Sequence, residues 1–336
     1  MNTLRVSLLL SAVLFAFAAP TRAADTPAYK IVDRIKVPDG GFDYANYDPA
    51  TGKIYMARTD FTTVIDPKTG QVSQLKSAVR GHMALPIPGT SMILLPQRQG
   101  TIRIIDGAND MVVADILAGK NPDGAVYDPF SKLVFVMNHD SGDSTVVDPA
   151  TKKSVATIPV GGELEFPQSD GAGKIFVNDE AGNEIGVIDV KARKTIGRYK
   201  LAGCMAPTGL AYIPEGKLLI STCENEMTKV LQADTGKEVI TLKTAAGPDA
   251  VIYDARRKLV FIPAGDAGIL DVVNVADPAH ISIVQHITTS KGTRTGVVDP
   301  TTGKVYLMAF KNDPKPGPGG RAVRLAGSFE VLVVGP

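Results

Sequence analysis

Short runs of alternating apolar and polar residues, each ended by a tight turn, fill most of this chain. The stretch PDGAVYDPFSKLVFVMN at 122–138 has an apolar alternation, an Asp-Pro turn and a second apolar run. Alternation with a period of two predicts half-buried β-strands, and the Asp-Pro and Thr-Gly steps interrupt helices and favour hairpins. The pattern therefore predicts an all-β protein of short strands joined by tight turns.

The same hairpin recurs along the chain at nearly constant spacing. Seven related segments lie at 42–57, 82–96, 122–138, 165–179, 207–222, 248–263 and 294–309. Their leading residues are 39, 41, 42, 43, 41 and 45 positions apart. A third strand, such as TVVDPATKKSV at 145–155, and a fourth apolar run complete the unit. Four short strands in about forty residues predict a β-propeller blade and not a helical solenoid.

The two ends of the chain support a closed ring of seven four-stranded blades. The last unit supplies three strands, whereas the stretch AYKIVDRIKV at 28–37 is a spare strand near the N-terminus. Adding the spare strand to the last blade would remove two exposed sheet edges. We therefore expect one seven-bladed domain over residues 25–336, closed by its N-terminal strand.

The first residues have the layout of a cleaved secretory signal. Arg5 precedes an apolar run from Val6 to about Ala19, and small residues follow at Ala23 and Ala24. The apolar run is too short to span a membrane comfortably as a helix. We expect residues 1–24 to be removed and the rest to be exported to the periplasm or secreted, without a membrane anchor and as a monomer.

Several segments carry the signature of a known family. LVFVMN, KIYMAR and KIFVND, with the elements VIDPKTGQV and VVDPATKKSV, resemble the YVTN-type repeats of YncE-like propeller proteins. The resemblance covers nearly the whole mature chain, and departs from the pattern at 94–96 and 219–221, where the aromatic residue and the Asn are missing. It implies an exported seven-bladed propeller, but a fold of this kind does not define an activity.

Charge and motifs exclude several classes of function. Without Arg5 and Arg22 of the signal, 34 basic residues face 35 acidic ones, a net charge of −1. This balance argues against nucleic acid as a partner, because nucleic-acid binding normally needs a basic surface. The sequence has no nucleophile elbow, phosphate-binding glycine loop, haem-attachment motif or multi-Cys/His zinc spacing. It names no cofactor and leaves a divalent metal open.

Cys204 and Cys223 are the only cysteines, and export favours a disulfide between them. They flank a hairpin that turns at 214–216, and their midpoint falls between residues 213 and 214, next to the turn. Positions equidistant from a turn come opposite each other in an antiparallel pair. A redox-active pair is the alternative, which the absence of a Cys-x-x-Cys motif disfavours.

The leading residues of the repeats are expected at one mouth of the central channel, because the first strand of each blade lines it. They form the predicted ring Asp43, His82, Asp123, Glu165, Thr208, Asp249 and Arg294. The ends of the second strands should open on the same face and add Arg58, Arg98, Asn138 or His139, Asp179 or Glu180, Glu224, Asp266 and Lys311. The basic segment 311–324 is long enough to lean over this opening.

Six of the seven ring positions are ionisable, which makes two kinds of chemistry available. Converging carboxylates and a histidine can bind a divalent cation, with His82, Asp123 and Glu165 as ligands. They can also form a general acid/base pair, while Arg294 holds an anionic group of a substrate. The remaining ligand-binding candidates on this face are Asp43, Asp249 and His139.

A structural role for the ring is the alternative. An Asp at the head of an inner strand can cap a turn by accepting bonds from backbone N–H groups. Charged residues also cost little in a water-filled channel. Asp123 and Asp249, each preceded by proline, fit this interpretation.

Two hypotheses of function follow. The first is a periplasmic binding or interaction protein, whose partner is a small molecule or a periplasmic protein bound on the ring face. The second is an enzyme, a metal-assisted lyase or lactonase that acts on a small anionic substrate at the same face. The rigid repeat scaffold and the lack of a catalytic motif favour the first.

Overall fold

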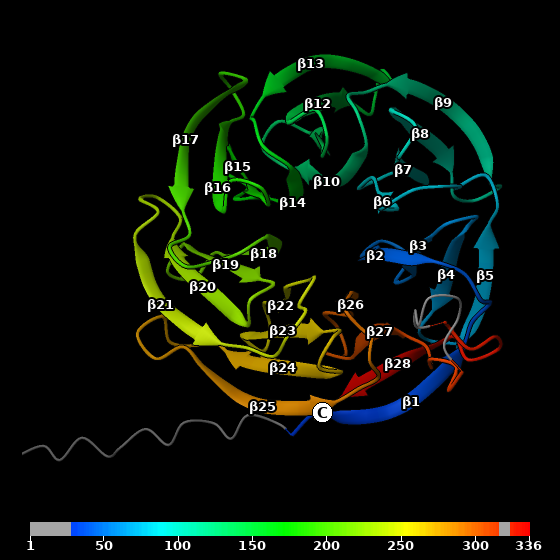
Figure 1. Cartoon of the computed structure of the whole chain (residues 1–336). Helices are drawn as coiled ribbons and strands as arrows, with labels where there is room; N and C mark the ends of the chain where they lie inside the picture. Colours follow the sequence, from blue (N-terminus) through cyan, green and yellow to red (C-terminus); the bar gives the residue numbers. More distant parts are fainter. Residues whose placement is uncertain (1–27, 316–322) are drawn as a thin grey trace, which may run out of the picture.

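Seven four-stranded antiparallel sheets form a ring around a central axis (Figure 1). This is a computed structural model, and it describes residues 28–315 and 323–336. Within these ranges the chain contains strands and turns but no helix, and so none that could cross a membrane. The predicted all-β, seven-bladed propeller is confirmed, whereas the predicted signal at 1–24 lies outside the described residues.

Each blade is numbered here in chain order, and its strands run from the channel outwards. Blade 1 consists of β2 (Phe42–Tyr47), β3 (Ile54–Arg58), β4 (Thr62–Asp66) and β5 (Gln71–Leu75). Blade 2 consists of β6 (Leu85–Pro86), β7 (Met92–Gln97), β8 (Thr101–Asp106) and β9 (Met111–Leu117). Blade 3 consists of β10 (Pro122–Asp128), β11 (Leu133–Asn138), β12 (Asp143–Asp148) and β13 (Lys153–Pro159). Blade 4 consists of β14 (Leu164–Ser169), β15 (Lys174–Asp179), β16 (Glu184–Asp189) and β17 (Lys194–Lys200). Blade 5 consists of β18 (Pro207–Ile213), β19 (Leu218–Cys223), β20 (Met227–Gln232) and β21 (Glu238–Lys243). Blade 6 consists of β22 (Ile252–Asp254), β23 (Leu259–Ala264), β24 (Ile269–Asn274) and β25 (Ser282–Thr288). Blade 7 consists of β26 (Gly296–Val298), β27 (Val305–Ala309), β28 (Glu330–Gly335) and β1 (Lys30–Lys36).

The N-terminal strand closes the ring as predicted. In Figure 1 the blue strand β1 lies along the red strand β28, and the two pair antiparallel from Lys30↔Gly335 to Lys36↔Glu330. The neighbouring Tyr29 exchanges two hydrogen bonds with Gln285 of β25: its N–H donates to Oε1 at 2.9 Å and its carbonyl accepts from Nε2 at 2.7 Å. The N-terminal segment therefore completes the sheet of blade 7 and also connects it to blade 6.

Aspartates at the ends of the inner strands stabilise the turns that the sequence pattern predicts. In blade 1, Asp48 Oδ1 accepts the N–H of Ala50 at 2.9 Å and its Oδ2 accepts the hydroxyl of Thr51 at 2.6 Å. Gly52 then takes a φ of 74°, a left-handed conformation that favours glycine. Asp299 makes the same two contacts in blade 7. Such side-chain bonds replace the backbone partners that a turn lacks.

The core lies between neighbouring blades. Phe135 and Phe176 of the YVTN-like segments, and Phe261 at the matching position of blade 6, are at most 1% exposed. Each belongs to the second strand of its blade, which is buried on both faces because it packs against two neighbours. Burying such a side chain contributes roughly 1.5–3 kcal/mol.

The predicted disulfide between Cys204 and Cys223 is confirmed, with a Cα–Cα distance of 5.4 Å. The register argument for it was wrong. Cys223 at the end of β19 pairs with Pro207 and not with Cys204, because the hairpin is centred about two residues beyond the midpoint of the two cysteines. Cys204 precedes β18, and the loop carries it to Cys223. A disulfide indicates an oxidising compartment.

Replacing both cysteines by alanine should lower stability. The crosslink closes a 19-residue separation, which corresponds to roughly 3 kcal/mol in the chain-entropy model. Urea unfolding of the C204A/C223A variant, and of the wild type with and without reductant, measures this loss. Equal unfolding midpoints, or two free thiols in an Ellman titration of the unreduced protein, would contradict the expectation.

Candidate functional site at the channel mouth

A β-bulge at the head of the inner strand marks the ring position in most blades. In blades 1, 3, 4 and 5 the pairing of the first and second strands shifts by one residue near the channel mouth. Two residues of the inner strand then face one of its partner, which bends the strand and re-aims a side chain. The first residues of these bulges are Asp43, Asp123, Glu165 and Thr208.

Blades 2 and 6 repeat this arrangement. The bridge Gly81↔Gln97 is one residue out of register with the β6–β7 pairing, and the bridge Pro248↔Ala264 is equally out of register with β22–β23. His82 and Asp249 directly follow these bridges, so they occupy the position of the bulged residues. The local backbone thus gives the ring residues of six blades a common origin.

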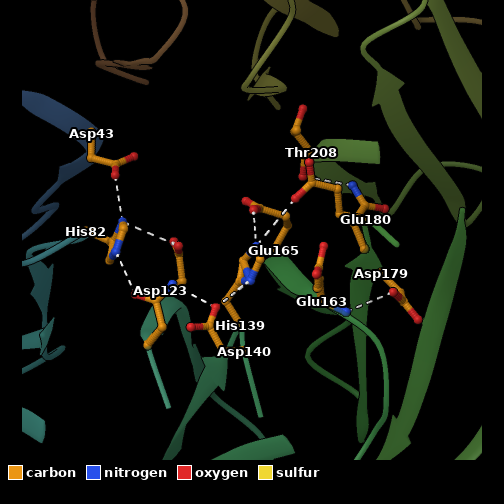
Figure 2. A network of polar contacts seen from close by, with 12 residues as sticks. Asp43, His82, Asp123, His139, Asp140, Glu163, Glu165, Asp179, Glu180 and Thr208 are labelled. Carbon is orange, nitrogen blue, oxygen red and sulfur yellow. Dashed lines mark hydrogen bonds and ion pairs between the residues drawn. The ribbon is translucent and has the colours of Figure 1, made fainter. Parts of the chain in front are cut away.

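His82 links three blades at the mouth, as Figure 2 shows. Its Nδ1 lies 2.7 Å from Asp43 Oδ2 and 3.3 Å from Asp123 Oδ2, and its Nε2 lies 3.3 Å from Asn121 Oδ1. His82 and Asp123 are each 6% exposed. Asp123 Oδ1 is buried and has no hydrogen-bond partner among the described residues.

A second cluster gathers around His139. Its Nε2 lies 3.3 Å from Glu165 Oε1 and 3.4 Å from Glu180 Oε2, and the three ligand atoms of the group all lie within 4.8 Å of one another. Tyr44 donates its hydroxyl to Glu165 Oε2 at 3.0 Å, and His139 Nδ1 lies 3.2 Å from Asp140 Oδ1. Figure 2 shows this cluster beside Asp123.

These separations suit a divalent cation. Nitrogen and oxygen ligands of zinc lie about 2.0–2.2 Å from the ion, so two ligands at a tetrahedral angle are about 3.3–3.6 Å apart. His139, Glu165 and Glu180 could therefore hold such an ion. The partner that commonly orients a metal-bound histidine through its other nitrogen is missing among the described residues, because His139 Nδ1 lies 3.2 Å from Asp140 Oδ1 but forms no hydrogen bond.

Burial shifts the protonation of the carboxyl groups upwards. It raises the pKa of Glu165 to about 8, and the charges of Asp249 and Glu180 add to the effect. It also raises the pKa of Asp123 well above its usual range, with Asp43 and Glu165 contributing. Like charges in a buried site disfavour a second ionised carboxylate. Too little positive charge therefore lies near Asp123 and Glu165 for all the carboxyl groups around them to be ionised near neutral pH.

Asp249 and Arg294 form an ion pair on the opposite side of the ring. Arg294 Nε lies 3.1 Å from Asp249 Oδ2. Burial raises the pKa of Asp249 to about 6, and the charge of Arg294 limits this rise. The seventh ring residue, Thr208, donates its hydroxyl to the carbonyl of Pro248 at 3.0 Å and so connects blades 5 and 6.

The structure distributes the predicted metal ligands over both clusters. His82 and Asp123 belong to the first, whereas Glu165 lies with His139 and Glu180 in the second. The sequence indicated Glu180 as one of two alternatives at a strand end and His139 as a ligand-binding candidate. Their grouping depends on how neighbouring blades pack, for which the sequence carries no signal.

Tyr44 joins packing and polar contacts at the mouth. Its ring centroid lies 4.9 Å from that of Phe166, and its hydroxyl donates to Glu165. Asp123 and Asp249 do not cap turns, because neither side chain accepts a hydrogen bond from a backbone N–H group of a described residue. Figure 2 shows Asp123 directed into the polar network instead.

Comparison with known proteins identifies the fold. The sequence matches no protein-family model and no curated protein. Among solved structures, the WD40 repeats of RRP9 match at a TM-score of 0.76 and 9% identity, over 90% of this chain and 97% of that one. A chain of hydrazine synthase from Kuenenia stuttgartiensis matches at 0.72 and 12%, over 87% and 97%, and one of the mitotic checkpoint complex at 0.72 and 13%, over 97% and 99%. Such low identity supports the seven-bladed fold alone, and the YncE-like family stays a prediction.

The raised pKa of Asp249 predicts a pH-dependent loss of stability. An unfolded Asp ionises near 3.8, whereas the folded protein keeps this proton up to about 6, so the free energy of unfolding falls as pH rises through this window. The full shift corresponds to at most roughly 3 kcal/mol.

Urea unfolding between pH 4 and pH 7 measures this slope. The difference between wild type and Asp249→Asn should change across the window, because the variant cannot titrate there. The exposed neighbour Asp266 provides the matched control, and Asp266→Asn should follow the wild type. Parallel profiles for wild type and Asp249→Asn would contradict the assignment.

Proposed function

We propose that this chain is an exported, periplasmic binding protein whose small-molecule ligand occupies the channel mouth. The observation that carries the proposal is the side chain of Asp123, which is 6% exposed and has an oxygen without a hydrogen-bond partner among the described residues. A buried polar atom without a partner destabilises the folded protein, so its retention beside His82 and the other ionisable ring residues favours a role in binding. The disulfide and the predicted signal support an oxidising, extracytoplasmic compartment.

The surroundings of Asp123 strengthen the argument. Turn aspartates such as Asp48 have all their oxygens engaged by nearby backbone and hydroxyl groups, which explains them structurally. Asp123 shares its histidine with Asp43 and lies near Glu165, so its charge is met only in part. Groups with strongly shifted protonation in a cleft are candidates for function. A small ligand fits better than a protein, because these groups lie inside the mouth and not on a flat face.

The enzyme hypothesis has one specific observation in its favour. His139, Glu165 and Glu180 offer three ligands, which is the number that catalytic zinc sites use while one position stays open for water or substrate. An ion bound there would act as a Lewis acid on a carbonyl group, as a lyase or lactonase requires. The other ring residues would then position the substrate around it.

A ligand screen tests the binding proposal. We expect at least one compound from a library of small charged metabolites to raise the melting temperature of the wild type. The variant Asp123→Asn should lose this stabilisation, because it changes a group at the mouth without changing its size. Asp33→Asn makes the same change on the exposed outer strand β1 and should retain it.

Two outcomes would contradict the binding proposal. One is a screen in which no compound stabilises the wild type. The other is stabilisation of equal size in the wild type and in Asp123→Asn, since the ligand would then bind away from Asp123.

Elemental analysis tests the metal-assisted enzyme. If the second cluster holds an ion, protein loaded with zinc should retain about one ion per chain, and EDTA should lower its melting temperature. Glu180→Gln should abolish retention, whereas Glu163→Gln, an exposed glutamate nearby, should not. His82→Ala distinguishes the two ligand sets, because it should lose the ion only if His82 is a ligand. Wild-type protein without retained zinc would remove this hypothesis.

A further inference from the structure

Five arginines surround one cavity at the channel mouth. The cavity has a volume of about 520 Å³, and its lining includes Arg58, Arg80, Arg98, Arg294 and Arg324. Asp43 is the single carboxylate in this lining, and it already pairs with His82. A guanidinium group is charged near neutral pH. The cavity therefore carries a large excess of positive charge.

The backbone holds three of these arginines together. Arg58 ends β3 in blade 1, and Arg98 directly follows β7 in blade 2. Arg80 lies in the connection between these blades, where its N–H donates to the carbonyl of Thr59 at 2.7 Å and its carbonyl accepts from Arg98 N–H at 3.3 Å. The pairing that positions the ring residues thus also brings arginines of two blades to one cavity wall.

Arg58 supplies a fixed positive charge. It is 1% exposed, and its guanidinium donates to the carbonyls of Gly41 and Pro38, both at 2.7 Å, and to the hydroxyl of Thr63 at 3.0 Å. These acceptors are neutral, and Asp39, the carboxylate whose charge acts on Arg58, forms no ion pair with it, so the charge is balanced only in part. Burial lowers the pKa of Arg58 to about 10, and the charge of Arg324 adds to this effect. A buried charge without a counterion is costly.

Four arginines can donate to a ligand. Arg80, Arg98 and Arg324 form no side-chain hydrogen bond or ion pair within the described ranges, and the Asp249 contact of Arg294 is made by Nε alone. Arg324 stands over the ring of Phe310, with its guanidinium carbon 4.7 Å from the ring centroid. Aromatic faces hold a cation without consuming its N–H donors. The aromatic contact therefore orients Arg324 without neutralising it, and the N–H donors of Arg80 and Arg98 are likewise not engaged by described residues.

We propose that this arginine cavity binds the carboxylate or phosphate group of a small organic anion. The inference rests on the proposed binding function and names the class of ligand. Guanidinium groups bind both kinds of oxyanion through paired N–H donors, and an anion here would also balance the buried charge of Arg58. Pockets for small organic molecules commonly measure about 300–1,000 Å³, so the cavity has room for more than an inorganic ion.

The adjoining part of the mouth adds selectivity. A second cavity of about 240 Å³ shares Phe42, Arg294 and Arg324 with the first, and its lining also includes Glu224, Asp249 and Asp266. Carboxylates there repel a second anionic group and accept hydrogen bonds from hydroxyl or amino groups. The ligand therefore carries its anionic group at one end and hydrogen-bond donors at the other.

Isothermal titration calorimetry with citrate and with pyrophosphate tests the cavity. The two probes separate carboxylate from phosphate recognition, and the wild type should bind at least one of them, more weakly at higher salt. Arg98→Gln should weaken binding about tenfold and the double variant Arg80→Gln/Arg98→Gln about a hundredfold, as expected for charge-assisted hydrogen bonds. Arg256→Gln provides a matched loss of charge in the turn after β22, at the far end of the strand, and should bind like the wild type.

The inference is overturned if the wild type binds neither probe, or if the double variant, folded by its melting curve, binds as tightly as the wild type. These results can be told apart from failure of the binding function itself. A cationic or neutral compound whose binding depends on Asp123 would preserve that function while excluding an anionic ligand. A probe that binds through the arginines but independently of Asp123 would leave this inference standing and contradict only the assignment of the binding site to Asp123.

Discussion

The pairing between the first and second strands of each blade is the constraint on which the site depends. Closure of the ring makes every inner strand begin at the same mouth, and in six blades the pairing slips by one residue there. Such a slip leaves residues outside the ladder and turns a side chain in a new direction. The fold thereby delivers one variable side chain per blade to a common place, without disturbing the hydrophobic packing between blades.

The charges delivered to the mouth are separated in space. Arginines of blades 7, 1 and 2 line one cavity, whereas the carboxylates of blades 3 to 6 collect around His139 and Asp249. His82 lies at the boundary, between Asp43 and Asp123. Neither half is neutralised by the other, since Arg294–Asp249 is the one arginine–carboxylate pair between ring residues in the described part of the chain. A polar ligand could balance both halves at once.

The fold was predictable from sequence because its information is local and repeated. Each hairpin carries its own turn aspartate and apolar alternation, and seven copies fix the blade count and the role of the segment 28–37. The ring positions followed from aligning the repeats. Contacts between blades did not, because Glu165 meets His139 through tertiary packing. Likewise the sequence argument placed Cys204 opposite Cys223 within the hairpin, whereas a loop outside the hairpin ladder brings Cys204 to Cys223.

The chain offers its own reporters for the central claim that the ligand binds at the channel mouth. Of its four histidines, His82 and His139 lie at the mouth, whereas His280 and His286 lie at the outer edge of blade 6. Imidazole nitrogen NMR spectra, recorded with and without the compound that stabilises the protein most, distinguish the two locations directly. The account predicts shifted signals for His82 and His139 and unchanged ones for His280 and His286. Unchanged mouth histidines beside a bound ligand would contradict it.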